Sequence, residues 1–239
     1  MKRFFLLGIF CFILFSCKKN ATKSKLPVIS TSTVSNSFEI TGNLENFFPK
    51  KIFFNKIIEE SMYQIDSCEV KNNYFTFKGQ VEFPERFALT FENYSAVTIL
   101  IIENTQIKLL INSKEISEPT ITGSKANQLL NQYKKDSKQI FKKIEYLFPQ
   151  FQKARLENDA VKLDEIGSQV KIIENEFTNF SYKFINQHKN SFVAAMILRD
   201  QLKSSNIDTV QIKKFYEILS SEVKQSPDAE IIASFLKLH

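Results

Sequence analysis

The sequence is poor in the residues on which most catalytic and metal sites depend. Its 239 residues include two histidines, three cysteines and no tryptophan. His188 and His239 alone cannot supply a histidine metal cluster or a Ser-His-Asp triad. The glycines stand singly, so the Gly-rich patterns of phosphate-binding loops and nucleophile elbows are missing. We therefore expect no enzyme activity, no metal site and no cofactor.

Cysteine is also too scarce for disulfide chemistry in the body of the chain. Cys68 is the one cysteine after residue 17, so the body has no internal disulfide and no C-x-x-C pair for thiol-disulfide exchange. Cys68 lies in a strand-like run at residues 64–70, where a small buried side chain is the simpler interpretation. A reactive thiol site at Cys68 stays open as the alternative.

The net charge of +6 comes entirely from the first part of the sequence. Residues 1–37 contain six basic and no acidic residues, which leaves 26 basic and 26 acidic residues in the rest. A body of zero net charge gives no argument for binding nucleic acid. We therefore expect no nucleic-acid partner.

The first seventeen residues have the pattern of a secretory signal. Lys2 and Arg3 precede an apolar run over residues 4–15, which Ser16 and Cys17 end. As a helix that run would be roughly 18 Å long, too short for the ~30 Å core of a bilayer. The pattern looks like the lipobox of bacterial lipoproteins, in which the chain is cut before an acylated cysteine. An ordinary signal peptide with a chance cysteine, or an uncleaved anchor, is the alternative.

A lipid on Cys17 would fix where the protein acts. We expect residues 1–16 to be a signal peptide, and residues 17–37, rich in Ser, Thr, Asn and Lys, to be a lipidated flexible tether. Lys18 and Lys19 follow Cys17 and no acidic residue is near, which favours the outer membrane with the protein facing the periplasm. The membrane is then a partner through the lipid.

Between residues 38 and 123, apolar and polar residues alternate with a period of two. This alternation is typical of half-buried antiparallel strands, and the turns between them predict a β-sandwich or a partly open barrel. We expect Asn72-Asn73 and Asn104-Thr105 to form tight hairpin turns, and residues 96–102 to be a central strand covered on both faces. About eight strands are predicted, at residues 38–42, 51–58, 62–70, 74–79, 86–92, 96–103, 106–112 and 119–122.

After Gly123 the apolar residues recur at alternating steps of three and four, which predicts helices with a coiled-coil-like seam. Two such stripes joined by polar residues 157–159 indicate a helical hairpin, kinked or interrupted at Pro149. Shorter helices are expected at residues 191–203, 209–223 and 228–238, capped by Asn190, Asp208 and Ser226.

These patterns together predict an α+β fold, with an antiparallel β domain at residues 38–123 and a helical region at residues 124–239. Phe177, Phe180 and Phe184 form an aromatic stripe on the second helix of the hairpin. Such a stripe belongs to the core or the seam unless it faces outward, in which case it would be a partner face.

Several short motifs are shared with one known family. They are Phe38-x-Ile40-x-Gly42, Asp66-Ser67 entering a strand, Phe75-x-Phe77-x-Gly79 followed by Pro84, the Glu103-Asn104 turn, Thr120-x-x-Gly123-Ser124 opening a helix, and Phe184-Ile185 followed by Asn190-Ser191. Over residues 37–235 the sequence resembles the family catalogued as domain of unknown function 4369. In that family a β domain follows a lipoprotein signal, runs into a helical region and very often continues into a thioredoxin-like domain. That domain would begin at the end of this sequence, so we expect the redox centre to be missing.

The sequence therefore predicts a membrane-anchored bacterial lipoprotein that acts as a non-catalytic binding or scaffolding module in the cell envelope. Its partner would be another envelope protein, which the resemblance suggests is thioredoxin-like. Two alternatives stay open. One is an accessory domain acting in trans with a thioredoxin-like oxidoreductase, and the other is the binding of an apolar small ligand in the β domain, suggested by 24 phenylalanines.

Overall fold

A computed structural model describes residues 36–59, 61–204 and 207–238. The predicted signal peptide, the predicted lipidation site Cys17 and most of the predicted tether lie outside the described residues. None of the described helices is both long enough and apolar enough to cross a membrane.

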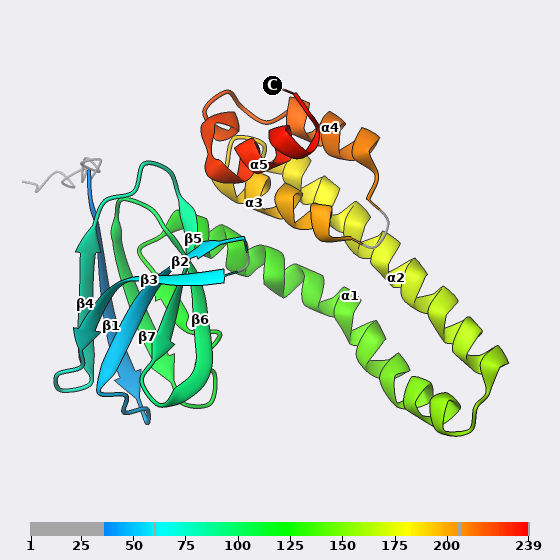
Figure 1. Cartoon of the computed structure of the whole chain (residues 1–239), viewed down its shortest axis with the longest axis horizontal. Helices are drawn as coiled ribbons and strands as arrows, with labels where there is room; N and C mark the ends of the chain where they lie inside the picture. The colour runs from blue at the N-terminus through cyan, green and yellow to red at the C-terminus, as the bar shows by residue number, and fades with distance from the viewer. Residues whose placement is uncertain (1–35, 60, 205–206, 239) are drawn as a thin grey trace, which may run out of the picture. The chain divides into compact units, whose positions relative to one another are not determined.

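Eight strands build the N-terminal part, as the alternating pattern predicts (Figure 1). They are β1 (Phe38–Glu45), β2 (Lys51–Ile58), β3 (Ser61–Glu69), β4 (Tyr74–Gly79), β5 (Glu85–Phe91), β6 (Tyr94–Ile102), β7 (Gln106–Asn112) and β8 (Thr120–Thr122). They pair into two four-stranded sheets with the orders β4-β1-β7-β8 and β3-β2-β5-β6. All pairings are antiparallel except that of β1 with β7. The fold class is thus confirmed as α+β with an open sandwich.

Phenylalanine fills the space between the two sheets. The ring of Phe54 lies 4.9 Å from that of Phe87, 5.2 Å from that of Phe77 and 5.9 Å from that of Phe38. Gly42 pairs with Phe75 across β1 and β4, and a Cβ on Gly42 would lie 2.0 Å from the Phe75 ring. The glycine of the Phe-x-Ile-x-Gly motif is therefore required by aromatic packing.

Two predictions about the strands are wrong in detail. The run at residues 96–102 is not a central strand, because β6 is at the edge of its sheet. Only its end, from Leu100 to Ile102, is buried on both faces, since Ile101 points to the helical core while its two neighbours point into the sandwich.

The turn at Asn104-Thr105 is not a hairpin turn. β6 and β7 belong to different sheets, so Ile102 and Ile107 enter the sandwich core from opposite sides. The Asn104 side chain instead binds both backbone groups of Val81, accepting from its N–H at 3.0 Å and donating to its carbonyl at 2.7 Å. Asn72 and Asn73 do form a tight turn, with φ angles of 53° and 60°, closed by the antiparallel bridge between Lys71 and Tyr74. The hairpin ends there, because β3 and β4 also belong to different sheets.

The helices follow in the predicted order. They are α1 (Lys125–Leu156), α2 (Ala160–Gln187), α3 (Phe192–Asp200), α4 (Thr209–Glu217) and α5 (Pro227–Phe235), with short 3₁₀ helices η1 (Gln201–Lys203) and η2 (Val223–Gln225). The hairpin of α1 and α2 is confirmed, and both helices are drawn running side by side in Figure 1. Asp208 and Ser226 cap α4 and α5 as predicted.

Three helix details differ from the predictions. α1 is not interrupted at Pro149 and continues for seven residues beyond it, because the proline removes only the one N–H that would bind the Glu145 carbonyl; a kink there stays a prediction. The helix expected at residues 209–223 ends at Glu217, and Val223–Gln225 form the separate 3₁₀ helix η2. The cap of α3 is Ser191 rather than Asn190, since the Ser191 hydroxyl accepts from the Val193 N–H.

Sandwich and helices belong to one compact unit and are joined by specific polar contacts. The amide of Asn127 on α1 accepts from the Ile101 N–H at 2.9 Å and donates to the Ile101 carbonyl at 2.6 Å. Asn127 thus continues the hydrogen-bond ladder at the free edge of β6. On the other side of the joint, Arg86 of β5 binds both carboxylate oxygens of Asp200 at the end of α3.

Candidate functional site

The hairpin is much less completely buried in the half that points away from the sandwich. Its own core consists of Ile140, Leu147, Ala154, Ile166 and Ile173. Near its base it is covered by α3, whose residues from Val193 to Leu198 are all buried. The far half has no further helix packed on it in the described part of the chain, because a two-helix layer leaves both of its faces open.

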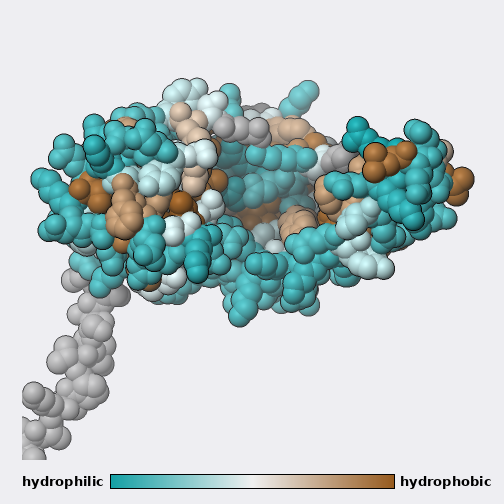
Figure 2. Space-filling model, turned by 90° about the horizontal axis from the view of Figure 1, so that it is seen from below, coloured by the Kyte–Doolittle hydropathy of each residue, from teal (hydrophilic) through white to brown (hydrophobic). Residues whose placement is uncertain are grey.

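One face of the far half carries the clearest candidate site, which we call the Tyr146 face. It is lined by Lys142, Lys143, Tyr146, Leu147, Gln169, Ile172 and Ile173 and has a volume of about 470 Å³. Tyr146 is 75% and Ile172 is 66% exposed, although both are large apolar side chains. Figure 2 shows hydrophobic residues at the surface at the hairpin end of the molecule. Exposed apolar groups with a polar rim are typical of protein interaction sites.

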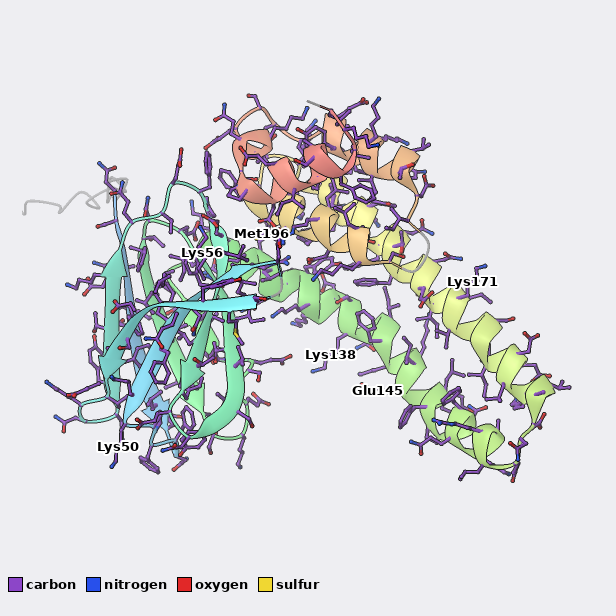
Figure 3. All side chains as sticks on the ribbon, in the orientation of Figure 1. Lys50, Lys56, Lys138, Glu145, Lys171 and Met196 are labelled. Carbon is purple, nitrogen blue, oxygen red and sulfur yellow. The ribbon has the colours of Figure 1, made fainter. Side chains whose placement is uncertain are left out.

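The electrostatic setting of this face is basic. α1 contains eight basic and two acidic residues, whereas the chain after residue 37 has no net charge. Lys143 pairs with Glu176 of α2 at 2.5 Å, which leaves Lys142 as an unpaired charge on the rim among the described residues. Figure 3 shows Lys138 and Glu145 on the side of α1 that faces away from α2; neither lines the Tyr146 face, so its charge comes from Lys142 and Lys143. The face is therefore suited to a partner that combines apolar and acidic groups.

The aromatic stripe that the sequence offers as a partner face lies in the seam. Phe184 is buried, and Phe177 and Phe180 are half-buried. All three rings surround Tyr133 of α1, at centroid distances of 5.0 Å, 6.2 Å and 5.3 Å respectively. They face inward because the alternating steps of three and four turn the whole stripe toward α1. Of the two interpretations of the stripe, the structure therefore supports the seam and not the partner face.

Tyr133 is the most perturbed titratable group at this seam. Its hydroxyl hydrogen-bonds the Ser181 hydroxyl at 2.8 Å. Burial raises the pKa of Tyr133 to about 12, although the hydrogen bond with Ser181 lowers it in part. The charge of Asp200 raises this pKa further and that of Arg86 lowers it, and both effects are smaller. A phenol held neutral in this way packs and shares a hydrogen bond with Ser181, and it offers no acid or base at ordinary pH.

Cys68 lies on β3 and is half-buried against the sandwich core. Burial raises the pKa of the Cys68 thiol, a hydrogen bond with the Thr76 backbone lowers it, and the charge of Asp66 raises it further. The net increase reduces the thiolate fraction, which is the nucleophilic form. The geometry therefore favours the packing role for Cys68 over the thiol site.

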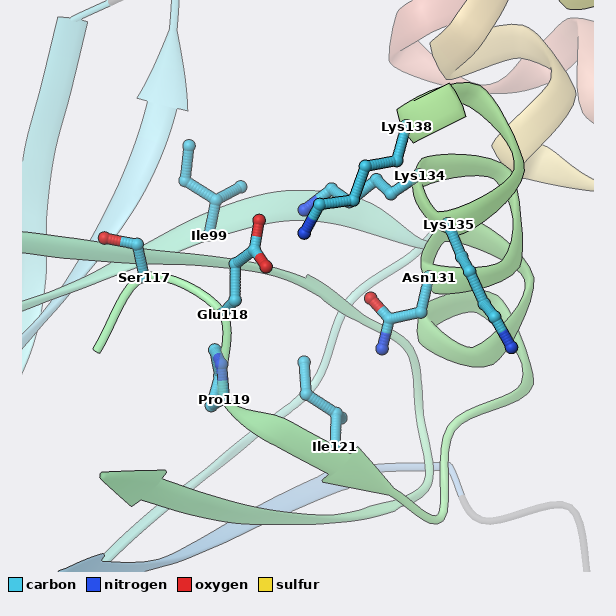
Figure 4. A pocket seen from close by; sticks show the side chains of 9 residues that line it. All are labelled: Ile99, Ser117, Glu118, Pro119, Ile121, Asn131, Lys134, Lys135 and Lys138. Carbon is cyan, nitrogen blue, oxygen red and sulfur yellow. The ribbon is translucent and has the colours of Figure 1, made fainter. Parts of the chain in front are cut away.

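A second concavity lies where α1 leaves the sandwich (Figure 4). It has a volume of about 250 Å³, and Ile99, Pro119 and Ile121 form its apolar side. The side chains of Lys134 and Lys138 project into it from α1, whereas that of Lys135 points away. The lysines are exposed, and Glu118 faces them across the opening, so its charge offsets part of theirs.

A third concavity, of about 320 Å³, lies along the joint between the sandwich and the helices. Its charged groups are engaged with one another, in the pairs Lys56–Glu85, Arg86–Asp200 and Arg199–Asp228. Burial lowers the pKa of Arg86, but the hydrogen bonds and charge of Asp200 outweigh it, so the pKa is raised overall. Of these pairs, Arg86–Asp200 crosses the joint, whereas Lys56–Glu85 lies within the sandwich and Arg199–Asp228 within the helices. We assign these groups no ligand.

The described residues contain no group of three or more His, Cys, Asp or Glu side chains that could hold a metal ion. Sequence reasoning missed Tyr146 and Ile172 as site residues because it followed the apolar stripes that form the seam. The available signal was the presence of large apolar residues outside those stripes, at positions where a surface helix normally carries polar groups.

Comparison with known proteins gives one family. No curated protein and no solved structure matches the chain. The family model described as domain of unknown function (DUF4369) matches residues 38–130, which contain all eight strands and the first turns of α1, including Asn127. The resemblance proposed for residues 131–235 lies outside this match and stays a prediction. Residues 38–130 of this chain are therefore a DUF4369 domain, as the motifs in the strands predict.

Proposed function

We propose that this protein is a lipid-anchored, non-catalytic binding module of the bacterial cell envelope, and that it docks another envelope protein on the Tyr146 face. The observation that carries the proposal is the exposure of Tyr146 and Ile172 on a two-helix layer. A partner that covered these side chains would gain a binding free energy of about 25 cal/mol for each Å² of apolar surface removed from water. The lipid anchor on Cys17, at the outer membrane facing the periplasm, rests on the lipobox pattern.

The charge of α1 narrows the chemistry of the partner. Lys142 stands on the rim of the Tyr146 face beside the exposed Tyr146 ring. An apolar ridge flanked by carboxylates would bury its apolar groups against Tyr146 and Ile172 and place its acids near the lysines. Such rim charges chiefly increase the association rate and the specificity of binding.

The two alternatives have weaker support. An accessory role with a thioredoxin-like oxidoreductase through Cys68 needs an accessible thiolate, and the half-buried thiol with its raised pKa argues against it. An apolar ligand in the β domain needs space between the sheets, where Phe38, Phe54, Phe77 and Phe87 pack on one another. A thioredoxin-like protein as the partner on the Tyr146 face remains compatible with the proposal.

Site-specific photo-crosslinking in intact cells tests the proposed function. A photoreactive residue replaces Ile172, and a matched one replaces Val210 of α4, which is 77% exposed but lies away from the Tyr146 face. We expect one envelope protein to be captured from position 172, not from position 210, and to be lost in the Cys17→Ser variant. Equal capture from both positions, or none from position 172 in the lipidated protein, would contradict the proposal.

A further inference from the structure

The opposite face of the hairpin has a second set of features that the proposed function does not use. Gly167 lies inside the 28-residue helix α2, where glycine is a poor helix former. A Cβ at Gly167 would have no atom within 4 Å, so nothing within the described part of this chain requires a glycine there. A glycine on a helix face allows another backbone to approach closely.

Apolar rings and charges surround Gly167. A concavity of about 440 Å³ is lined by Phe151, Leu163, Ile166, Gly167, Val170, Lys171 and Glu174. At about 100° per residue, Phe141 and Phe148 of α1 project on the same side of the seam as Phe151, whereas Tyr146 projects on the other. Phe148 is 57% exposed. We call the surface formed by Phe141, Phe148, Phe151, Gly167, Lys171, Glu174 and Thr178 the Gly167 face.

The charges of this face complement their own two-fold copy. Lys171 and Glu174 are exposed, and neither forms an ion pair with another described residue. Suppose that α2 packs antiparallel to α2 of a second copy, with the two-fold axis passing between residues 172 and 173. Lys171 of each copy then lies opposite Glu174 of the other copy. The same symmetry places the small residues Gly167 and Thr178 opposite each other. Mutual complementarity of one patch is what a two-fold interface requires.

The neighbouring helix obeys the same symmetry. An axis between residues 144 and 145 of α1 places Phe141 of each copy opposite Phe148 of the other. The contact of Phe141 with Phe177, at 4.7 Å between ring centroids, and the Lys143–Glu176 pair show which residues of α1 and α2 lie side by side. By this alignment, the axis position on α1 and the axis position on α2 lie at the same height along the hairpin to within about two residues, or roughly 3 Å. One two-fold axis can therefore relate the aromatic and the charged residues together.

We propose that the Gly167 face binds a second copy of this chain, so that two hairpins form an antiparallel four-helix bundle. Each pair of copies has two Lys171–Glu174 contacts and two Phe141–Phe148 contacts, and Gly167 lets the α2 helices approach. The Tyr146 faces stay on the outside of the bundle. This inference does not rest on the proposed function, because the two surfaces lie on opposite sides of the hairpin.

Sedimentation equilibrium of the full chain in density-matched detergent tests the dimer. We expect a dimer with a dissociation constant below about 100 µM. Lys171→Glu places like charges opposite each other twice, and we expect it to weaken dimerisation by about tenfold or more. Lys183→Glu makes the same charge change on the other side of α2, and we expect no effect. The double variant Lys171→Glu/Glu174→Lys exchanges the charges and should restore the dimer.

Gly167→Leu adds a second test, since the added side chain has open space in the single copy but blocks close approach of two helices. We expect a folded monomer, with the helical content by circular dichroism unchanged. Three results would overturn the proposal: a full chain that is monomeric at about 100 µM, a dimer insensitive to Lys171→Glu or Gly167→Leu, or a double charge exchange that fails to restore dimerisation.

Discussion

The sandwich and the far half of the hairpin use aromatic residues in opposite ways. In the sandwich, Phe38, Phe54, Phe75, Phe77 and Phe87 are each at most 5% exposed and pack ring on ring. In the far half of the hairpin, Tyr146 and Phe148 are mostly exposed over a core of five small and aliphatic side chains. The same residue types thus stabilise one region and are left uncovered in the other.

This difference separates the region that maintains the fold from the region available for contacts. Burying apolar area is the largest favourable contribution to folding, and the DUF4369 domain buries its phenylalanines between its own two sheets. The far hairpin gains little stability from its exposed rings as a single chain. A chain that keeps such rings in water gains from them only when a second surface covers them.

The largest expected effect contrasts one phenylalanine from each region. Phe54→Ala leaves a cavity beneath three neighbouring rings, and we expect the free energy of unfolding to fall by about 3–5 kcal/mol. Phe148→Ala removes an exposed ring, and we expect a change within about 0.5 kcal/mol at a protein concentration low enough to keep the chain monomeric. Urea unfolding followed by circular dichroism measures both. Equal losses would show that the far hairpin is part of the stabilising core.

The joint between the two regions should also be sensitive. Asn127→Ala removes both hydrogen bonds to the Ile101 backbone and leaves buried polar groups of β6 unsatisfied. We expect a loss of about 3 kcal/mol in the same unfolding experiment. Asn131→Ala, one turn further along α1 at an exposed position, is the matched control and should cost little. A small effect at Asn127 would mean that water replaces its amide at the β6 edge.

The base of the hairpin should respond to alkaline pH. The pKa of Tyr133 is raised to about 12 in the folded protein, from about 10 in an unfolded chain. Its contribution is therefore complete below pH 10 and is lost as the pH rises toward 12, for a total of about 3 kcal/mol. We expect unfolding curves of the unaltered protein and of Tyr133→Phe to converge or cross over this range. A pH-independent difference between them would show that Tyr133 is not buried as a neutral phenol.

The smallest expected effect is at Gly167. Alanine there meets no neighbouring atom and favours the helix, so we expect Gly167→Ala to stabilise the single chain by about 0.5–1 kcal/mol. Thermal unfolding at low protein concentration measures this gain without contribution from association. A loss of stability would show that the Gly167 backbone is strained or closely packed within the chain itself.

Most of the fold can be predicted from local patterns. The alternation in Phe38–Glu45 and the seam spacing of α1 and α2 depend on neighbours in sequence, which is why these elements appear where expected. The partners of the elements cannot be predicted in this way. Residues 96–102 look like a central strand because helices cover their far end. Asn104 looks like a hairpin residue although its amide binds Val81 in the segment between β4 and β5.

The candidate site was less predictable than the fold. Phe177, Phe180 and Phe184 attract attention as an aromatic stripe, yet the same spacing makes them seam residues around Tyr133. Tyr146 and Ile172 are single apolar residues, and their significance appears only when the hairpin is seen to lack a covering layer. The Lys171–Glu174 symmetry likewise requires knowing which face of α2 is free.

Thiol labelling of Ile172→Cys tests whether the Tyr146 face is covered in the cell. Both variants carry Cys68→Ser, so that the introduced cysteine is the free thiol of the body, and it is treated with a maleimide in intact cells and in the purified protein, beside Val210→Cys as the exposed control. We expect position 172 to be labelled in the purified protein and protected in cells, whereas position 210 should be labelled in both. Equal labelling of position 172 in cells and in the purified protein would contradict it.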